Sequence, residues 1–510
     1  MIAQVLSCSV TGVDAFFVEV EVDISSGLPS FTTVGLPEAA VKESRERVKS
    51  AIKNSGYRFP DDRITVNLAP ADVKKDGTAF DLPVAMAILA ATRIIPASTL
   101  KDNIFIGELS LDGRVKPVKG ALTIAIEAEK AGYRNIIVPY ENRKEASVVE
   151  GLSVYPARTL SQVIGFLGGF TEIIPETADL KSMFQTSHNF DYDFSHIAGQ
   201  EHVKRAMEIS AAGSHNVMMS GPPGSGKTMI AKSFSSILPP LTFHEALETT
   251  KIFSITGMLE KNQALVTQRP FRSPHHTISD AGLIGGGHRP RPGEVSLAHN
   301  GVLFLDELPE FKKHVLEVLR QPLEDRQVTI SRAASSLTYP ASFTLIAAMN
   351  PCPCGYFSDP SHECRCTYAQ VQKYRSKISG PLLDRIDMQV EVPAVSYREI
   401  KQNIAGESSS TIRQRVIAAR NIQTARFKKS GVYNNAQMNS RQLLKYCPLD
   451  TPTQNLLETA IEKFGMSARA YNRVIKIART IADLEGLDNI AEQHISEAIQ
   501  YRNLDRKELF

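Results

Sequence analysis

The residues from 215 to 234, HNVMMSGPPGSGKTMIAKSF, constrain the fold of this chain more than any other segment. Gly221 is followed by four residues and then by Gly226, Lys227 and Thr228, which is the phosphate-loop pattern. A short apolar strand precedes the loop and a helical pattern follows it, as the motif requires. Glycines let the backbone wrap around phosphate, with amides at a helix N-terminus pointing toward the anion. The segment predicts a nucleotide-binding α/β domain, the alternative being a glycine-rich turn that binds nothing.

The side chains of this loop have distinct expected roles. Lys227 would reach the β- and γ-phosphates, and the Thr228 hydroxyl would ligate Mg²⁺. The residues of the loop that we expect at the nucleotide are Gly221, Pro222, Pro223, Gly224, Ser225, Gly226, Lys227 and Thr228.

Two later apolar runs end in polar side chains. The run 302–305 ends in Asp306 and Glu307, and the run 343–348 ends at Asn350. In open α/β sheets, ligands bind at the carboxyl ends of the strands. Asp306 would hold Mg²⁺ through water, Glu307 would polarise the attacking water, and Asn350 could orient that water. The alternatives are a strand that ends at the surface and an asparagine that forms a turn.

Four motifs carry a resemblance to a known family. In order, GPPGSGKT, FLDE, IAAMNPCPCG and SGPLLDRID look like the Mg-chelatase-related branch of the AAA+ ATPases. Within that branch, nearly the whole chain most resembles the ComM/YifB family of bacterial DNA helicases. The resemblance implies Asn350 as sensor 1, Arg385 as the arginine finger and Arg469 as the sensor-2 arginine. Arg473, one helical turn on, is an alternative for sensor 2.

The resemblance also implies a function. Lys227, Glu307, Asn350 and Arg385 would form the catalytic set of an ATP hydrolase that uses ATP and Mg²⁺. Because AAA+ fingers reach a neighbouring subunit, it implies a homo-oligomeric ring, expected to be a hexamer. Such a ring would act on single-stranded and branched DNA, with a recombinase as a further partner, and would drive branch migration in homologous recombination and transformation. As a structural alternative, Arg385 could pair with a neighbouring aspartate on the surface.

Composition and length are compatible with this function. With 510 residues, the chain suggests about three domains, and its net charge of +3 is too small to argue for nucleic-acid binding. The N-terminus lacks a basic region followed by a long apolar run, and no apolar stretch reaches membrane-spanning length. We therefore expect a cytoplasmic protein with no membrane partner. The expected domains are 1–171, a linker 172–195, an AAA+ core 196–395 and a helical lid 396–510.

The N-terminal third predicts a separate α/β domain. Alternating apolar residues at 18–24 and 64–68 indicate half-buried strands, and Asp112-Gly113 indicates a hairpin turn within 104–115. Helical patterns cover 37–54, 81–91 and 120–131.

This domain resembles the proteolytic domain of Lon-type proteases, which has a ribosomal S5 domain 2-like fold. The segments KKDGTAFDLPVAMAILAA and VKPVKGAL parallel the Lon nucleophile and lysine segments. Aligned from Lys75, the nucleophile position carries Ala79 and the lysine position carries Leu122, with Lys119 nearby. Neither side chain can attack or activate a nucleophile. Thr78 is a conceivable nucleophile for which the sequence shows no placed base, so we expect a Lon-like scaffold without peptidase activity. The alternative function is a Mg-chelatase-like motor that acts in inserting a metal into a porphyrin. The Lon-like domain speaks against that alternative, because such motor subunits lack one.

Four of the six cysteines lie close together after sensor 1. Cys352 and Cys354 stand in PCPCG, and Cys364 and Cys366 stand in HECRC. Four thiolates in two close pairs can form a tetrahedral Zn²⁺ site, although this spacing is tighter than usual. The alternative is four reduced thiols in a surface loop.

Two basic segments are candidates for DNA contact. In the segment 269–295, the basic residues lie among glycines, and in the segment 327–340, a hairpin pattern carries Arg332 near its tip. Arginines on glycine-supported loops suit phosphate contacts, the alternative being a solvated loop. The basic residues of the first segment are Arg269, Arg272, His275, His276, His288, Arg289 and Arg291.

From about Ser396 onward the pattern becomes helical. We expect helices at 411–428, 451–463 and 491–502, and a helix between Ser467 as N-cap and Gly486. An apolar stripe runs along this last helix at Val474, Ile477, Ala478, Ile481 and Leu484. In an AAA+ protein such a bundle is the lid over the nucleotide. The expected fold class is thus α/β: a Lon-like α/β domain, a central phosphate-loop AAA+ domain with a parallel sheet, and a helical lid.

Overall fold

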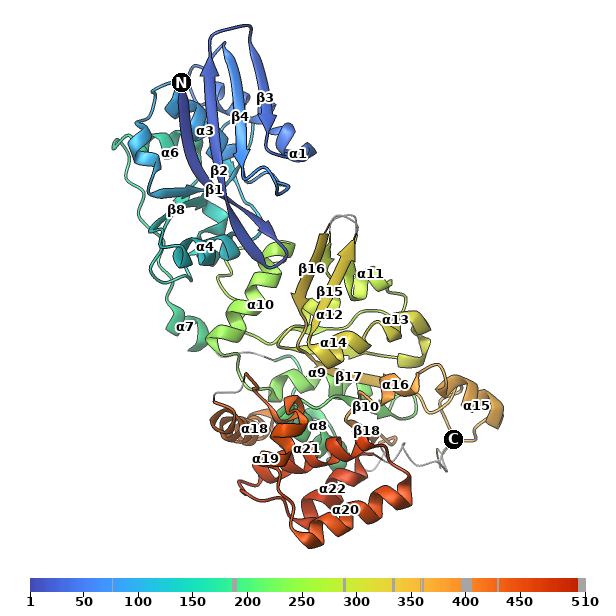
Figure 1. Ribbon diagram of the computed structural model, residues 1–510. Helices are drawn as coiled ribbons and strands as arrows, with labels where there is room; N and C mark the ends of the chain where they lie inside the picture. The colour runs from blue at the N-terminus through green and yellow to red at the C-terminus, as the bar shows by residue number, and fades with distance from the viewer. Residues whose placement is uncertain are drawn as a thin grey trace. The chain divides into compact units, whose positions relative to one another are not determined.

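The chain folds into two compact units in the computed structural model (Figure 1). Unit 1 comprises Met1–Thr186 and Phe243–Thr267, and unit 2 comprises Ser187–Thr242 and Gln268–Phe510. The structure describes residues 1–75, 77–185, 190–287, 290–332, 335–357, 359, 362–395, 406–428 and 431–502. Among the described helices, none combines the length and apolarity needed to cross a bilayer.

Unit 1 is built on a mixed seven-stranded sheet with the order β3-β4-β2-β1-β5-β8-β9. The expected alternation is confirmed, because Val18, Val20 and Val22 are fully buried on one face of β2. The strands β1, β2 and β4 pair antiparallel, whereas β5, β8 and β9 pair in parallel. The strands are β1 (Ile2–Thr11), β2 (Asp14–Ser25), β3 (Ser30–Val34), β4 (Arg63–Ala69), β5 (Asn103–Phe105), β8 (Asn135–Pro139) and β9 (Ser153–Ala157).

The helices and the hairpin of unit 1 follow the sequence pattern closely. The predicted helix 81–91 forms at those residues, and the predicted helix 37–54 is divided in two. The turn at Asp112-Gly113 joins β6 (Glu108–Leu109) to β7 (Val115–Lys116). The helices are α1 (Ala39–Lys42), α2 (Ser44–Asn54), α3 (Asp81–Ala91), α4 (Ala121–Lys130), α5 (Arg143–Ala146), α6 (Leu160–Leu167), α7 (Leu180–Gln185) and α10 (Phe243–Thr256).

Two segments of unit 1 differ from the sequence-based expectation. The segment 172–195 is not irregular throughout, because it contains α7, whose Leu180, Met183 and Phe184 pack on a buried cluster around Leu122. The segment 243–267, which we had placed within the AAA+ core, clusters with unit 1. Its helix α10 packs against α4, and the Ser254 hydroxyl of α10 donates a buried hydrogen bond to the Glu145 carboxylate of α5 at 2.5 Å.

Unit 2 contains a five-stranded parallel sheet with the order β11-β14-β17-β10-β18. Its strands β10, β14 and β17 are buried throughout, as expected for a sheet covered on both faces. The loops that follow these three strands therefore meet at one edge. The strands are β10 (Val217–Ser220), β11 (Phe271–Arg272), β14 (Val302–Leu305), β17 (Thr344–Met349) and β18 (Met388–Glu391).

The C-terminal part of unit 2 is helical, as expected. Ser467 caps the helix Ala468–Leu484 by accepting a hydrogen bond from the Ala470 amide at 3.3 Å. The predicted stripe is confirmed, with Val474, Ile477 and Ile481 fully buried in the same core as the sheet. The boundary at Ser396 lies outside the described residues. The helices are α18 (Ser409–Arg426), α19 (Ser440–Tyr446), α20 (Thr451–Phe464), α21 (Ala468–Leu484) and α22 (Glu492–Gln500).

Shorter elements complete unit 2. Around the sheet lie α8 (Glu201–Gly213), α9 (Lys227–Ile237), α11 (Asp280–Leu283), α12 (Glu294–Leu297), α13 (Lys313–Glu317), α14 (Arg320–Asp325), α15 (Tyr368–Arg375) and α16 (Gly380–Leu383). Two small ribbons pair β12 (Gly285–Gly286) with β13 (Arg291–Pro292), and β15 (Gln327–Arg332) with β16 (Ser335–Pro340). The second ribbon confirms the predicted hairpin. With the lid and the parallel sheet in place, the predicted fold class is confirmed.

Candidate nucleotide-binding site

The phosphate loop joins β10 to α9 and has the backbone that phosphate binding requires. Gly224 and Gly226 have left-handed φ values of +76° and +86°, which favour glycine. Gly221 permits a close approach, because a Cβ there would lie 2.1 Å from the Val392 carbonyl oxygen. Gln200 holds the loop from outside by donating to the Ser225 carbonyl oxygen at 3.0 Å. The loop amides and the N-terminus of α9 thus form an anion site.

Lys227 lies inside this loop. Its Nζ donates to the carbonyl oxygens of Gly221 and Pro222, both at 2.8 Å, and lies 3.3 Å from Oδ1 of Asn350. Burial lowers the pKa of Lys227 from its ordinary value, while the nearby Asp306 opposes that shift. The structure therefore brings together the predicted phosphate lysine and the predicted sensor-1 asparagine.

The two predicted magnesium ligands are also brought together. The Thr228 hydroxyl donates to Oδ2 of Asp306 at 2.9 Å. Mg²⁺ binds oxygens at about 2.1 Å in an octahedron, so adjacent ligands lie roughly 3 Å apart. A hydroxyl and a carboxylate at this separation fit two neighbouring positions around the ion. These side chains would hold Mg²⁺, directly or through water, and the ion would neutralise charge on the phosphates.

Glu307 follows Asp306 at the same edge of the sheet. It adopts a left-handed backbone with φ of +52°, and its side chain is 56% exposed. Its Oε2 lies 3.4 Å from Nδ1 of His276. His276, which we had grouped with the DNA-facing residues, thus belongs beside the carboxylate proposed to polarise water. No local pattern in the sequence indicates this contact.

The predicted arginine finger lies at the opposite edge of the sheet. Arg385 precedes β18, and Asn216, which precedes β10, donates to its carbonyl oxygen at 3.1 Å. The phosphate loop follows β10, whose four residues span roughly 13 Å at about 3.3 Å each. Arg385 therefore does not meet the phosphate loop of its own chain. Its guanidinium pairs with Glu324, and not with Asp384 or Asp387, the two aspartates near it in sequence.

The two candidate sensor-2 arginines of α21 have different surroundings. Arg469 is 62% exposed and lies 3.8 Å from Asp384, beside the predicted finger. Arg473 is 17% exposed and pairs with Asp387. Burial alone would raise the pKa of Asp387, but Arg473, His215 and the Asn216 amide together hold that pKa well below its usual range. Neither arginine therefore lies at the phosphate loop of its own chain, and the sensor-2 role stays a prediction.

Comparisons with known proteins place this site in a family. Three family models match: "Magnesium chelatase, subunit ChlI" at 193–400, "Subunit ChlI of Mg-chelatase" at 20–142, and "Magnesium chelatase, subunit ChlI C-terminal" at 406–502. Uncharacterized protein YifB of Salmonella typhimurium is 47% identical, over 97% of this chain and 96% of that protein. Competence protein ComM of Haemophilus influenzae is 44% identical, over 99% of this chain and 98% of that protein.

The chain belongs to the ComM/YifB family. It is an AAA+ protein of the Mg-chelatase type, which implies ATP and Mg²⁺ as its cofactors. We had argued against a chelatase-type motor because such subunits lack a Lon-like domain. This argument is wrong, because the family match at 20–142 carries a chelatase-subunit description. The N-terminal unit therefore does not separate the two functions.

The N-terminal unit of this ComM/YifB member also resembles Lon. Lon protease of Brevibacillus choshinensis is 30% identical over 157 residues, which is 28% of this chain and 20% of that protein. Leu122, at the lysine position, is fully buried among apolar side chains. Ala79 has no side chain that could react. The Thr78 hydroxyl donates to the Glu108 carboxylate, an acceptor that the sequence did not reveal.

The basic residues of the segment 269–295 have diverse partners. Arg269 donates to the carbonyl oxygens of Pro239 and Asn300, both at 2.7 Å. Arg272 forms a two-pronged ion pair with Glu294, at 2.6 and 2.8 Å. These two arginines hold the fold of unit 2 and are poorly placed for DNA. Of the others, His275 and Arg291 are exposed, whereas His288 and Arg289 lie outside the described residues.

Two exposed arginines remain, and the fold brings their ribbons together. Arg291 lies on β13 and Arg332 ends β15. A Cβ at Gly286, opposite Arg291, would lie 3.4 Å from Nη2 of Arg332. The Tyr339 hydroxyl of β16 donates to the Pro290 carbonyl oxygen at 2.8 Å. We call Arg291, Arg332 and the two ribbons that carry them the ribbon surface.

Proposed function

We propose that this protein is a ring-forming, Mg²⁺-dependent ATPase that translocates on DNA. In this proposal it drives branch migration in homologous recombination, including recombination of DNA taken up in natural transformation. Single-stranded and branched DNA are its substrates, a hexamer is its working form, and a recombinase is a further partner. A structural Zn²⁺ is a separate proposal.

The observation that carries the ring is the position of the arginines. Arg385 and Arg469 lie at the amino edge of the sheet, whereas the phosphate loop lies at the carboxyl edge. In a head-to-tail ring the amino edge of one subunit can face the nucleotide of the next, so both arginines would act there. Arg385 would exchange Glu324 for a phosphate of the neighbouring subunit's nucleotide. An arginine finger contributes a factor of roughly 10³–10⁵ to such a reaction.

The support for DNA comes from the ribbon surface and from one relative. The Haemophilus influenzae protein, which matches almost end to end, is named a competence protein. Arg291 and Arg332 provide two exposed guanidinium groups on adjacent glycine-supported ribbons, which suits contact with phosphates. The described ribbons offer no row of aromatic side chains for base stacking, so binding would be directed to the backbone.

The test is ATP hydrolysis with and without single-stranded and forked DNA. Wild-type hydrolysis should rise with DNA. Arg291→Ala with Arg332→Ala should remove the stimulation and leave basal hydrolysis intact. The slope of log affinity against log salt should flatten by roughly 0.7 per lost contact on single strands, or 0.9 on duplex.

A matched control removes the same charge elsewhere. Arg58 and Arg441 are exposed and lie outside the ribbons, so Arg58→Ala with Arg441→Ala should keep DNA stimulation and the salt slope. If the two double variants show the same DNA stimulation and the same salt slope, the ribbon surface does not contribute to DNA binding. If DNA does not change the rate of ATP hydrolysis by the wild-type protein, the proposal of a DNA-translocating motor is wrong.

A chelatase-type motor is the second candidate, and the three family matches favour it. Such a motor would use the same ATPase site to remodel a protein complex that inserts a metal into a porphyrin. It predicts stimulation of hydrolysis by a porphyrin-binding partner and indifference to DNA. The same ATPase assay therefore separates the two functions.

A further inference from the structure

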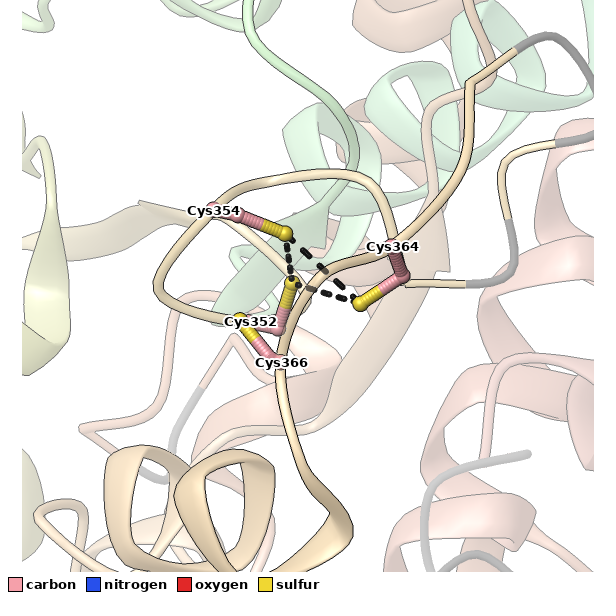
Figure 2. Close-up of side chains that lie close together, drawn as sticks. All are labelled: Cys352, Cys354, Cys364 and Cys366. Atoms are coloured by element: carbon pink, nitrogen blue, oxygen red, sulfur yellow. Dashed lines mark hydrogen bonds between the residues drawn. The ribbon is translucent and has the colours of Figure 1, made fainter.

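The loop between β17 and α15 gathers four thiols at one point. Figure 2 shows that Cys352, Cys354 and Cys364 point toward one another, with Cys366 beside them. The sulfur of Cys352 lies 3.3 Å from that of Cys354 and 3.7 Å from that of Cys364, and the last two are 3.6 Å apart. All four sulfur atoms lie within 4.8 Å of one another. The loop thus brings all four of the cysteines that the sequence singled out into one cluster.

These separations fit a metal better than they fit disulfides. All six cysteines of the chain are free, and a disulfide would need sulfur atoms about 2.05 Å apart. In a zinc tetrathiolate, each sulfur lies about 2.3 Å from the metal, so neighbouring sulfurs are roughly 3.8 Å apart. The cluster is close to that size. Four thiolates at such distances repel one another unless a cation lies between them.

The loop itself has little buried core, although Arg375 donates to its Pro351 carbonyl oxygen at 3.1 Å. It runs from Asn350 to Thr367, and its described residues lie in no helix or strand. Most of them are exposed or half-buried, and Cys352 and Gly355 are the buried exceptions among those described. Gly355 has φ of +90°, and its amide donates to the Cys352 carbonyl oxygen at 3.0 Å in a tight turn. A long loop with so little core gains most from a bound metal.

The same turn contacts the nucleotide site. A Cβ at Gly355 would lie 2.6 Å from Cδ of Pro223, so the backbone there lies directly against the phosphate loop. At the start of the loop, Asn350 lies 3.3 Å from Nζ of Lys227. The cysteine loop therefore supports the phosphate loop from one side and begins at sensor 1.

We propose that Cys352, Cys354, Cys364 and Cys366 bind one structural Zn²⁺, and that this zinc clasp braces the phosphate loop through Gly355 and Pro223. The second part rests on the proposed function only in that the phosphate loop binds ATP. The first part is independent of ATP and of DNA. The zinc would have no free coordination position, as in structural sites with four protein ligands.

Metal content is the first test. Protein purified without added metal should contain about one zinc per chain. Cys352→Ser with Cys364→Ser should lose it, whereas Cys447→Ala, which changes a cysteine outside the cluster, should keep it. Zinc that is nearly absent from the wild-type protein, or that the double variant keeps in full, would overturn the proposal.

A second measurement uses wild-type protein and avoids folding problems. A mercurial that reacts with thiols should release the zinc to a coloured chelator as the cluster reacts. Protein loaded with Co²⁺ instead should show the sulfur-to-cobalt charge-transfer and strong visible bands of a tetrahedral thiolate site. Zinc released without thiol reaction, or cobalt bands of an octahedral oxygen site, would contradict the four-cysteine assignment.

The brace is tested separately from the metal. Gly355→Ala should push the turn against Pro223 and weaken ATP binding about tenfold, while zinc content stays near one per chain. Gly486→Ala is the matched control, because that glycine also has a positive φ of +71° and its Cβ would meet nothing within 4 Å. Equal ATP affinity in the two variants would show that the clasp does not support the phosphate loop.

Discussion

Arg469 and Arg473 lie one turn apart on α21, yet losing Arg473 should lower stability, whereas losing Arg469 should slow ATP hydrolysis. Arg473 pairs with Asp387, whose Oδ2 also accepts the Asn216 amide at 2.9 Å. Arg473→Met would leave the Asp387 carboxylate buried without its cation. Removing one partner of a buried ion pair typically costs about 3–5 kcal/mol. We expect unit 2 of this variant to be destabilised by that amount.

Arg469 should matter for catalysis and little for stability. Its side chain is 62% exposed, and its contact with Asp384 is long, at 3.8 Å. Exposed pairs of this kind contribute about 0–1 kcal/mol. Arg469→Ala should therefore melt almost like the wild-type protein. If Arg469 is the sensor-2 arginine of a ring, this variant should still bind ATP and hydrolyse it slowly.

Thermal unfolding with and without a non-hydrolysable ATP analogue measures both effects. A ligand stabilises only the unit that binds it, so the transition that the analogue raises belongs to unit 2. Arg473→Met should lower that transition strongly, and Arg469→Ala should leave it nearly unchanged. Arg473→Lys, which keeps the charge but loses the planar fork, should fall between them.

The pH dependence gives an independent check. In the wild-type protein, Arg473 holds the pKa of Asp387 low, so this pair stabilises the fold above about pH 4 and that stability is lost as pH falls toward the folded pKa. In Arg473→Met, one of the interactions that oppose burial is lost, so the pKa of Asp387 should rise from its wild-type position while the His215 and Asn216 contacts remain. The difference in stability between the two proteins should therefore shrink as pH falls through that raised pKa. Arg473→Met that melts like the wild-type protein, or Arg469→Ala that hydrolyses ATP at the wild-type rate, would contradict these assignments.

Three further predictions concern the two units. Lys227→Ala should weaken ATP binding, whereas Glu307→Gln should keep binding and trap ATP; wild-type turnover by Glu307→Gln, measured by phosphate release, would disprove its role. Arg385→Ala should hydrolyse ATP poorly, and mixing it with Lys227→Ala subunits should restore some ATPase activity, because Arg385→Ala supplies the intact pocket and Lys227→Ala supplies the finger. Co-assembled rings that recover no ATPase activity would argue against action between subunits. Finally, unfolded protein incubated with ATP should stay uncut, and cleavage that disappears in Thr78→Ala would reveal a relocated nucleophile.

Local patterns were enough to predict much of this fold. The Ser467 cap depends on contacts within a few residues, so the sequence contains its cause. The alternating apolar residues of β2 identify the buried face without knowledge of its partners. The linker prediction was less accurate, because the polar run 172–195 includes α7, which forms on an apolar cluster supplied by distant residues.

The sequence was enough to predict a nucleotide-binding site, because the phosphate loop, Asp306 and Asn350 each follow a buried strand, and parallel strands deliver their carboxyl ends to one edge. The different surroundings of the two candidate sensor-2 arginines emerge only from the tertiary structure. Arg469 and Arg473 share one helix face in sequence, but exposure and the position of Asp387 separate them. His276 meets Glu307, and Gly355 meets Pro223, through strands far apart in the chain. Such contacts depend on how strands are ordered across the sheet, which no local pattern encodes.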